Sequence, residues 1–299
     1  RTRLFSEDSY SEALMLLMSE LKEIIPHAMA WFVDRMASHT GVSALLSNTL
    51  LTICNRTNAK AKHDAALARC QSVDSGFSLD TCGEVIHGTA GEEVLLYQYR
   101  FSHPMDFERT LWHEWGHLLS NQYIKEVNAE RLEYFKKREA SQDKYYHENL
   151  PADEREYQER LAFGTQLWCE FISDTICNIV ADDKPQGIAW PLQDQMKEML
   201  LAAVSNTPVR IELLAHYCSL VLTNATVVAH SEASEQFSVG LEYLPAEIAK
   251  LADRLLCLLA EQLNEEQICC ISKDRILEIG AVINEIWAVI ETTKFRRFR

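Results

Sequence analysis

Glycine and proline are scarce in this chain, and their scarcity restricts the fold more than any other feature. Only 10 glycines and 7 prolines occur in 299 residues. Because these residues interrupt helices and form most tight turns, their rarity favours long helices joined by few turns. Hydrophobic residues make up 47% of the chain, which is enough to build a large buried core. We therefore expect an ordered, mostly helical protein of one large domain or two modest ones.

One stretch, between residues 76 and 101, differs in composition from the rest of the chain. Glycines cluster there, and the segment Glu93-Val94-Leu95-Leu96-Tyr97-Gln98-Tyr99 is rich in strand-forming residues. This predicts a β-hairpin or small antiparallel sheet, with residues 83–88 as the partner strand. The expected fold is thus α+β, mostly α, with a small antiparallel sheet.

Helices are expected on both sides of this sheet. Pro104 is well placed to open one of them, because proline is favoured at the first helical position. Apolar residues at helical spacing predict helices over 9–38, 42–70, 104 to about 138, 151 to about 180, and in several pieces over 191–292. We divide the chain into an N-terminal helical region 1–75, a core 76–182 and a C-terminal helical region 183–299, which we expect to form one compact unit with the core.

Charge and cysteine usage limit the possible partners and compartment. The net charge of −15 argues against a nucleic-acid partner, since binding to phosphates needs a basic surface. The 9 cysteines are scattered and include no CxxC pair, which is typical of a reducing compartment. No segment has the composition of a membrane span or of the apolar part of a signal peptide. We expect a soluble, cytoplasmic protein.

The segment His113-Glu114-Trp115-Gly116-His117 carries the strongest chemical signal. Two histidines four residues apart lie on one face of a helix, so both imidazoles can bind one metal ion. Glu114 lies one position round the helix, where it can take a proton from a zinc-activated water. Gly116 is unfavourable inside a helix, which indicates a close approach of another backbone beside the metal. Two ordinary core histidines are the alternative interpretation.

A catalytic zinc site needs a third protein ligand, and Glu170 is the best candidate. Asp174 follows it by four residues on the same helical face, where it can accept the free ring N–H of a ligating histidine. Apolar neighbours surround both acids, so they should face a group that compensates their charge. A solvated acidic helix edge is the alternative. The competing ligands, all in the charged stretch 121–160, are Glu133, His147 and Glu148.

These motifs resemble the gluzincin zinc metallopeptidases, in which HExxH is followed by a helix carrying a glutamate ligand and an aspartate four residues later. The intracellular members of the ImmA/IrrE type are the most similar. The metzincin pattern fails, because Ser120 and Tyr123 stand where it needs a glycine and a histidine. The resemblance covers about residues 85–180. It implies that the charged segment 121–160 is an insertion, which we expect to form an outlying helical arm or lid.

We therefore predict a zinc-dependent peptide-bond hydrolase with a two-helix zinc-binding core. Its zinc ligands would be His113, His117 and Glu170, with Glu114 as general base and a peptide or protein as substrate. One alternative is a non-enzymatic helical regulatory protein with a structural or vestigial zinc. Another is a peptide deformylase, although the cysteine motif of those enzymes is not evident around Cys82.

Two further features have weaker signals. A reaction of this type needs a group that stabilises the oxyanion, and three downstream residues could supply it, although a buried structural role is the stronger interpretation of each. These residues are His216, Tyr217 and His230. The predicted strand 93–100 either binds an extended peptide by strand addition or is an ordinary internal strand.

Overall fold

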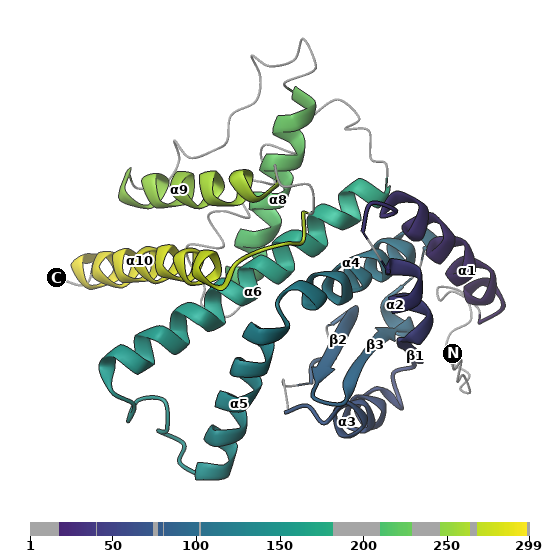
Figure 1. The fold of residues 1–299 in the computed structure, drawn as a ribbon, viewed down its shortest axis with the longest axis horizontal. Coiled ribbons are helices and arrows are strands. Elements are labelled where there is room, and N and C mark those ends of the chain that lie inside the picture. The colour runs from purple at the N-terminus through teal and green to yellow at the C-terminus, as the bar shows by residue number, and fades with distance from the viewer. Residues whose placement is uncertain are drawn as a thin grey trace.

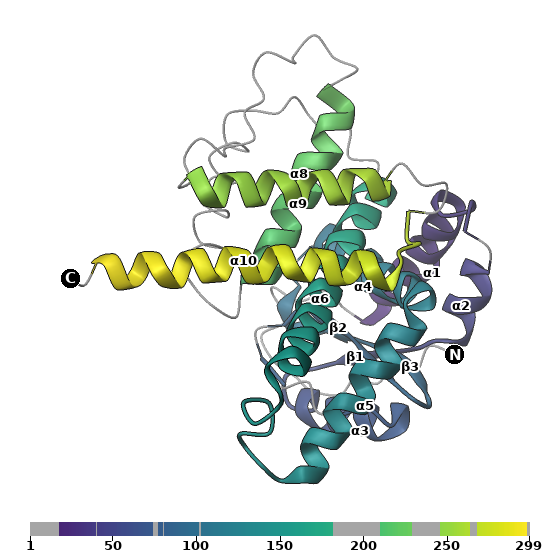
Figure 2. The same cartoon turned by 60° about the vertical axis from the view of Figure 1, so that its left-hand side comes forward.

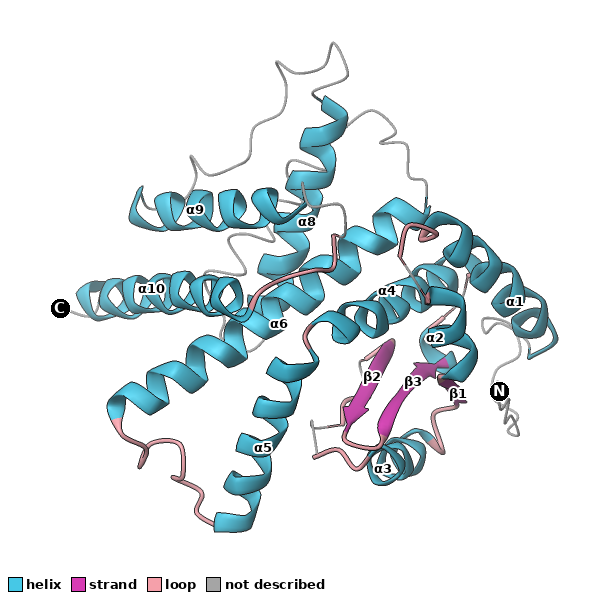
Figure 3. Ribbon diagram, viewed as in Figure 1, coloured by secondary structure: helices cyan, strands magenta, loops and turns pink. Residues whose placement is uncertain are grey.

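The computed structural model describes residues 18–39, 41–73, 77–79, 81–101, 103–181, 210–228, 246–263 and 268–297. Across these ranges the protein is mostly helical with one small sheet, which confirms the predicted fold class. The strands gather in one part of the molecule, and helices build the rest (Figure 3). None of the helices in these ranges is both long and apolar enough to cross a membrane.

The sheet has three strands in the order β1-β3-β2: β1 is Leu50–Cys54, β2 is Gly83–Gly88 and β3 is Gly91–Tyr97. β2 and β3 form the predicted antiparallel hairpin, and Gly91 takes a φ of 141° where the chain turns between them. β1 pairs with β3 in parallel, from Leu50 opposite Glu93 to Cys54 opposite Tyr97. The sheet is therefore mixed, and the prediction of a purely antiparallel sheet was wrong.

β1 interrupts the helix that was predicted over residues 42–70. The structure forms helix α2 over Val42–Asn48, then β1, then helix α3 over Ala59–Cys70. The run Leu50-Leu51-Thr52-Ile53-Cys54 is apolar on both faces, and a run this short has no periodicity that separates a buried strand from a buried helix. The prediction of one helix was wrong for that reason.

Helix α4, Pro104–Tyr123, packs against one face of the sheet, and α3 packs against the other. Pro104 opens α4 as predicted, and the side chain of His103 caps the helix by accepting from the Met105 amide at 3.2 Å. Helix α1, Met18–Arg35, lies along the side of α4, where the Trp112 indole donates to the Ala28 carbonyl at 3.2 Å. The part of the predicted first helix that precedes residue 18 lies outside the described residues.

The helix after Pro104 ends earlier than predicted. α4 stops at Tyr123, and Ile124 adopts a non-helical φ of −113° before α5 begins at Lys125 and runs to Ser141. Neither glycine nor proline marks this break, so the sequence gives no sign of it. α5, the turns between residues 142 and 151 and the first turns of the next helix form an arm that extends away from the sheet (Figure 1). Its proposed action as a lid stays a prediction.

Helix α6, Ala152–Ala181, is central to the molecule and contacts α4, α5, α8 and α10. The C-terminal region contributes α8 over Arg210–Val228, α9 over Ala246–Leu263 and α10 over Lys273–Arg297. α9 and α10 lie side by side in both views (Figures 1 and 2). One continuous cluster of buried apolar side chains joins all these helices, from Leu21 in α1 to Ile290 in α10.

Candidate metal centre

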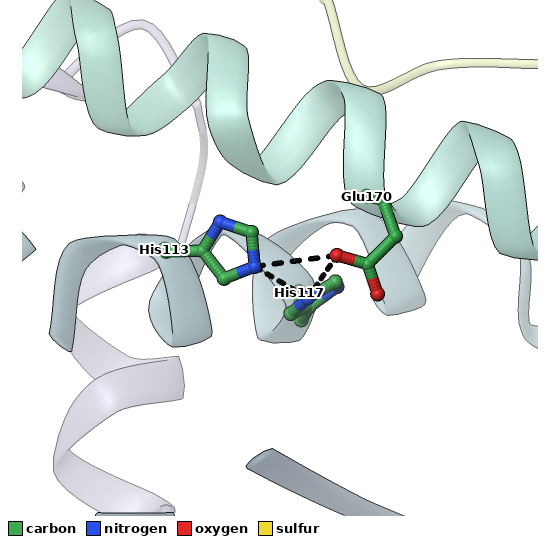
Figure 4. Close-up of side chains that lie close together, drawn as sticks. All are labelled: His113, His117 and Glu170. Carbon is green, nitrogen blue, oxygen red and sulfur yellow. Dashed lines mark hydrogen bonds and ion pairs between the residues drawn. The ribbon is translucent and has the colours of Figure 1, made fainter. Parts of the chain in front are cut away.

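α4 and α6 bring the three predicted metal ligands together. His113 and His117 project from one face of α4, and Glu170 projects toward them from α6 (Figure 4). The Nε2 atoms of the two imidazoles are 3.0 Å apart, and Glu170 Oε2 lies 3.4 Å from His113 Nε2 and 3.7 Å from His117 Nε2. Zinc–ligand bonds of about 2.0–2.1 Å at tetrahedral angles separate the ligand atoms by about 3.3 Å, so this triangle could hold one zinc-sized ion. Among the described residues, these three form the group of histidines, cysteines and acids that could hold a metal ion.

The close approach of α4 and α6 depends on Gly116. A Cβ atom at this position would lie 2.8 Å from Ser173 Cα, so any larger residue would push the two helices apart. Ser173 is fully buried, and in the sequence it lies between Glu170 and Asp174. The glycine of the motif is thus explained by a neighbouring backbone, as its position in the helix suggested.

Asp174 lies behind His113, as predicted, and also reaches a residue of α8. Its Oδ1 is 2.9 Å from His113 Nδ1, and its Oδ2 is 2.9 Å from His216 Nδ1. Donation of the Nδ1 proton to Asp174 leaves the Nε2 lone pair of His113 free to face the other donor atoms. The two hydrogen bonds outweigh the effect of burial and hold the pKa of the Asp174 carboxyl below its ordinary value.

The two imidazoles differ in their electrostatics. Burial alone would lower the pKa of His113, but its hydrogen bonds to Asp174 and Glu170 outweigh burial and raise that pKa well above the ordinary value. Burial lowers the pKa of His117 to about 4, against the opposing charge of Glu170. The centre therefore favours a positive charge between two carboxylates, beside one neutral ring. A metal cation is attracted to such a place for the same reason as a proton.

Glu114 lies beside the donor atoms without joining them. It is 4% exposed, and its Oε2 has no hydrogen-bond partner among the residues that the structure describes. Burial raises the pKa of this carboxyl to about 8, with the charge of His113 opposing the rise and that of Glu170 adding to it. Gly83 of β2 makes room for it, because a Cβ there would lie 2.8 Å from Glu114 Oε1. A carboxyl with this pKa and one free oxygen is suited to proton transfer near neutral pH.

The three side chains of the centre are partly exposed. The side chains of His113, His117 and Glu170 are 22%, 14% and 25% exposed. Structural zinc sites usually have four protein ligands and are closed, whereas catalytic sites have three and keep a position open. Within the described part of the chain, the group that could hold a metal has three members, and each is partly exposed.

The competing ligands lie elsewhere. His147 is held in the arm, with its Nδ1 2.7 Å from the Tyr134 hydroxyl and its Nε2 3.0 Å from Glu159. Glu133 pairs with Lys137 on the exposed side of α5. Neither residue belongs to the metal-binding group, and Glu148 does not belong to it either.

Helix α8 lies next to the centre, and the sequence indicated its contribution only weakly. His216, one of the three oxyanion candidates, bonds to Asp174, and Glu212 one turn earlier has a pKa raised by burial and then by the charge of Glu170. Tyr217 is fully buried, in line with the structural interpretation. His230 lies outside the described residues. The spacing of Glu212 and His216 places both on one face of α8, which was the signal available for Glu212.

The predicted strand 93–100 does not offer an edge to a peptide. Its regular part is β3, the central strand, which pairs with β1 on one side and β2 on the other. Strand addition at this segment is therefore excluded, and the internal-strand alternative is correct. The edge next to the centre belongs to β2.

Searches of the chain against protein-family models, curated proteins and solved structures found no match.

Proposed function

We propose that this protein is a zinc-dependent peptidase whose centre consists of His113, His117 and Glu170, with Glu114 as general base. The convergence of two imidazole Nε2 atoms and one carboxylate oxygen within 3.7 Å, beside a buried carboxyl whose pKa is about 8, carries the proposal. Similar motifs in the gluzincin peptidases support it.

The donor set fits zinc. Two imidazole nitrogens and one carboxylate oxygen form a ligand set of catalytic zinc sites, whereas calcium and magnesium prefer oxygen ligands. When bound, zinc would supply a Lewis acid that polarises the peptide carbonyl and lowers the pKa of water toward neutrality. The hydrogen bond from His113 Nδ1 to Asp174 fixes the orientation of that ring.

The protein's own groups then move the protons. Glu114 takes a proton from the attacking water as the water oxygen bonds to the peptide carbon. It returns the proton to the leaving amine nitrogen as the C–N bond breaks, so the carboxylate is regenerated. The low accessibility of Glu114 keeps its pKa close to the working pH, which favours both transfers.

His216 is suited to stabilise the oxyanion. Asp174 binds its Nδ1, which leaves Nε2 as the ring nitrogen available to substrate, and the side chain is 41% exposed. A donor held in place by a second group acts on developing charge without reorganising. His216 thus joins the site through the same carboxylate that orients His113.

The edge of β2 is suited to bind an extended peptide. Cys82 bonds toward β3, since its carbonyl accepts from the Tyr97 amide at 2.9 Å, whereas the His87 carbonyl bonds to Ser72 on the other side. Backbone groups alternate along an antiparallel strand, so those of Gly83 and Val85 also point away from β3. Gly83 touches Glu114, so a strand added there would run past the general base.

A non-enzymatic protein with a structural or vestigial zinc is the second candidate. Among the described residues the group has three members, and their side chains are partly exposed. These two features favour the enzyme, because a structural site would be closed by a fourth ligand.

Metal analysis combined with a hydrolysis assay tests the proposal. We expect about one zinc per chain, lost in His113→Ala and His117→Ala but kept in His27→Ala, a matched control whose side chain is 75% exposed. A library of peptides incubated with the protein and analysed by mass spectrometry should show cleavage that a chelator stops and zinc restores. Zinc bound without cleavage would favour the structural alternative, and the absence of any transition metal would refute both.

A further inference from the structure

A pocket of about 250 Å³ lies where α1, the first turns of α4 and the last residue of α6 meet. The three helices come together on one side of the molecule (Figure 1). The residues of the metal centre, His113, His117, Glu170 and Glu114, do not line this pocket. It is therefore a second concave site, which the proposed hydrolysis does not use.

The apolar part of the pocket is fixed by hydrogen bonds to the backbone. The indole N–H of Trp31 donates to the Val180 carbonyl at 2.6 Å, and that of Trp112 donates to the Ala28 carbonyl at 3.2 Å. Because their polar atoms are satisfied in this way, the two rings present apolar surface to the pocket. Met105, which is 56% exposed, adds an apolar side chain that solvent can reach. A wall that is already in place lowers the cost of ordering the site when a ligand binds.

Two opposite charges line the pocket without pairing with each other. The Glu108 side chain is only 20% exposed, and its carboxylate makes no hydrogen bond within the described part of the chain. Its Oε1 lies 3.8 Å from His27 Nδ1, which is beyond hydrogen-bond distance. Arg109, the next residue, donates from Nη2 to the Asn178 amide oxygen at 3.4 Å. Consecutive side chains on a helix diverge by about 100°, so the carboxylate and the guanidinium approach the pocket from different directions.

The two charges favour a ligand that carries both signs. A cation would be attracted by Glu108 and repelled by Arg109, and an anion would meet the reverse. A ligand with an ammonium and a carboxylate can satisfy both groups at once. A guanidinium has five N–H donors in a planar fork, so Arg109 can bind Asn178 and a carboxylate at the same time.

The size of the pocket narrows the class of ligand further. Its volume of about 250 Å³ is below the range of roughly 300–1,000 Å³ that drug-sized ligands occupy. A small molecule that joins one ammonium, one carboxylate and one apolar group is an α-amino acid. We propose that the pocket binds a free α-amino acid with an apolar side chain. Glu108 accepts from its ammonium, Arg109 donates to its carboxylate, and its side chain packs against the two indoles and Met105.

The pocket lies one helical turn from the metal centre. Arg109 precedes His113 by four residues on α4, and its partner Asn178 follows Asp174 by four residues on α6. His113 Nδ1 and Asp174 Oδ1 are 2.9 Å apart, so the pair of Arg109 and Asn178 forms the next layer along the same two helices. The amino acid is thus bound near the metal centre but not at it. The inference does not depend on the peptidase function, because no proposed metal ligand lines the pocket.

Calorimetric titration with amino acids and their fragments tests the inference. L-leucine and L-phenylalanine are titrated first, and binding of neither would overturn it. The tighter of the two is then compared with glycine and with the amine and the acid that share its side chain, which for L-phenylalanine are phenethylamine and hydrocinnamate. The amino acid should bind about 10–100-fold more tightly than each, since each lacks one charged or apolar contact. An amine or an acid that binds as tightly as the amino acid would contradict the inference.

Two variants assign the charged groups of the ligand. In Glu108→Gln the amino acid should lose most of its advantage over the acid that lacks the ammonium and keep its advantage over the amine. Arg109→Gln should show the opposite pattern. Asp106→Asn is the matched control, because Asp106 is exposed on α4 outside the pocket. Each ratio compares two ligands on one folded variant, so a change in stability cancels. Ratios that survive in both variants, or that Asp106→Asn also removes, would overturn the inference.

Removal of metal separates the pocket from the metal centre. A free amino acid can also bind a metal ion through its amine and carboxylate, so the titration is repeated after a chelator has removed the metal and has itself been dialysed away. Unchanged affinity is expected for the pocket, whereas binding that disappears with the metal would place the amino acid at the centre and overturn the inference. A protein that cleaves no peptide but binds amino acids in this way would refute the peptidase and leave the pocket standing.

Discussion

The two faces of the small sheet each place a histidine beside a glutamate, but only one face leaves its histidines partly exposed. Under α3, the side chain of His63 is 0% exposed, its Nε2 lies 3.6 Å from Glu84, and Tyr97 donates to the same carboxyl. Under α4, His113 and His117 are 22% and 14% exposed and turn their Nε2 atoms toward each other. The residue types are alike, and the exposure of the imidazoles separates the two clusters.

The connection between the faces is β2, where adjacent residues point in opposite directions. Gly83 lies against Glu114 on the α4 face, and Glu84 lies in the cluster on the α3 face, where Phe77 packs 5.4 Å from the His63 ring. Burial raises the pKa of both carboxyls. The comparison teaches that a perturbed pKa alone does not mark a functional site. Convergent donor atoms that a solute can reach are also needed.

The largest effect should come from a change of Glu114, the proposed general base. Glu114→Gln should lower kcat/KM by about 10²–10⁴-fold while zinc and fold are kept, because an amide cannot accept the proton. Glu84→Gln is the matched change on the other face and should keep hydrolysis. Kinetics with a cleaved library peptide, together with metal analysis, would check both. Equal losses in the two variants would mean that the faces do not differ in function.

The next effect concerns the metal. Glu170→Ala removes one of three donor atoms and should weaken zinc binding by more than about 100-fold, whereas Asp174→Asn should weaken it by about 10–100-fold, as the loss of an orienting partner does. Competition with a zinc-sensitive dye would measure both affinities. If Asp174→Asn cost more than Glu170→Ala, the assignment of ligand and orienting residue would have to be reversed.

The parts that the sequence predicted well depend on local patterns. The spacing of His113 and His117 fixes their common face on any helix, and the spacing of Glu170 and Asp174 does the same on α6. The hairpin of β2 and β3 also followed from a local signal, the glycines that flank strand-forming residues.

The parts that the sequence did not predict depend on contacts between distant segments. β1 is a strand because β3 pairs with it, which its own apolar run cannot show. Likewise, His216 reaches Asp174 because α8 packs beside α6, where the Thr175 and Ser219 hydroxyls lie 3.1 Å apart.

A smaller effect should appear in the pH dependence of stability. Because burial raises the pKa of Glu84 in the folded state, that state binds more protons than the unfolded state between the ordinary and the raised pKa. The contribution of Glu84 to stability therefore falls as pH rises through this window. Glu84→Gln should reduce the decline of the melting temperature as the pH rises through this window. Glu247→Gln, at an exposed position in the first turn of α9, should leave it as in the parent.

The smallest effect is that of Glu84, on one face of the sheet, on the pKa of Glu114 on the other face. The charge of Glu84 is one of the influences that raise the pKa of Glu114, after burial and the charge of Glu170. Glu114 must be ionised to accept a proton, so kcat/KM should rise with pH as this carboxyl loses its proton. Glu84→Gln lowers the pKa of Glu114. The acidic limb of the pH profile, over which kcat/KM rises, should therefore move toward lower pH. On this acidic limb, kcat/KM of Glu84→Gln should exceed that of the parent by less than about tenfold, the change that one full pKa unit would produce. A pH profile of the parent, Glu84→Gln and Glu247→Gln would measure it. A limb that stays in place in Glu84→Gln, or moves toward higher pH, would show that the charge of Glu84 does not raise the pKa of Glu114.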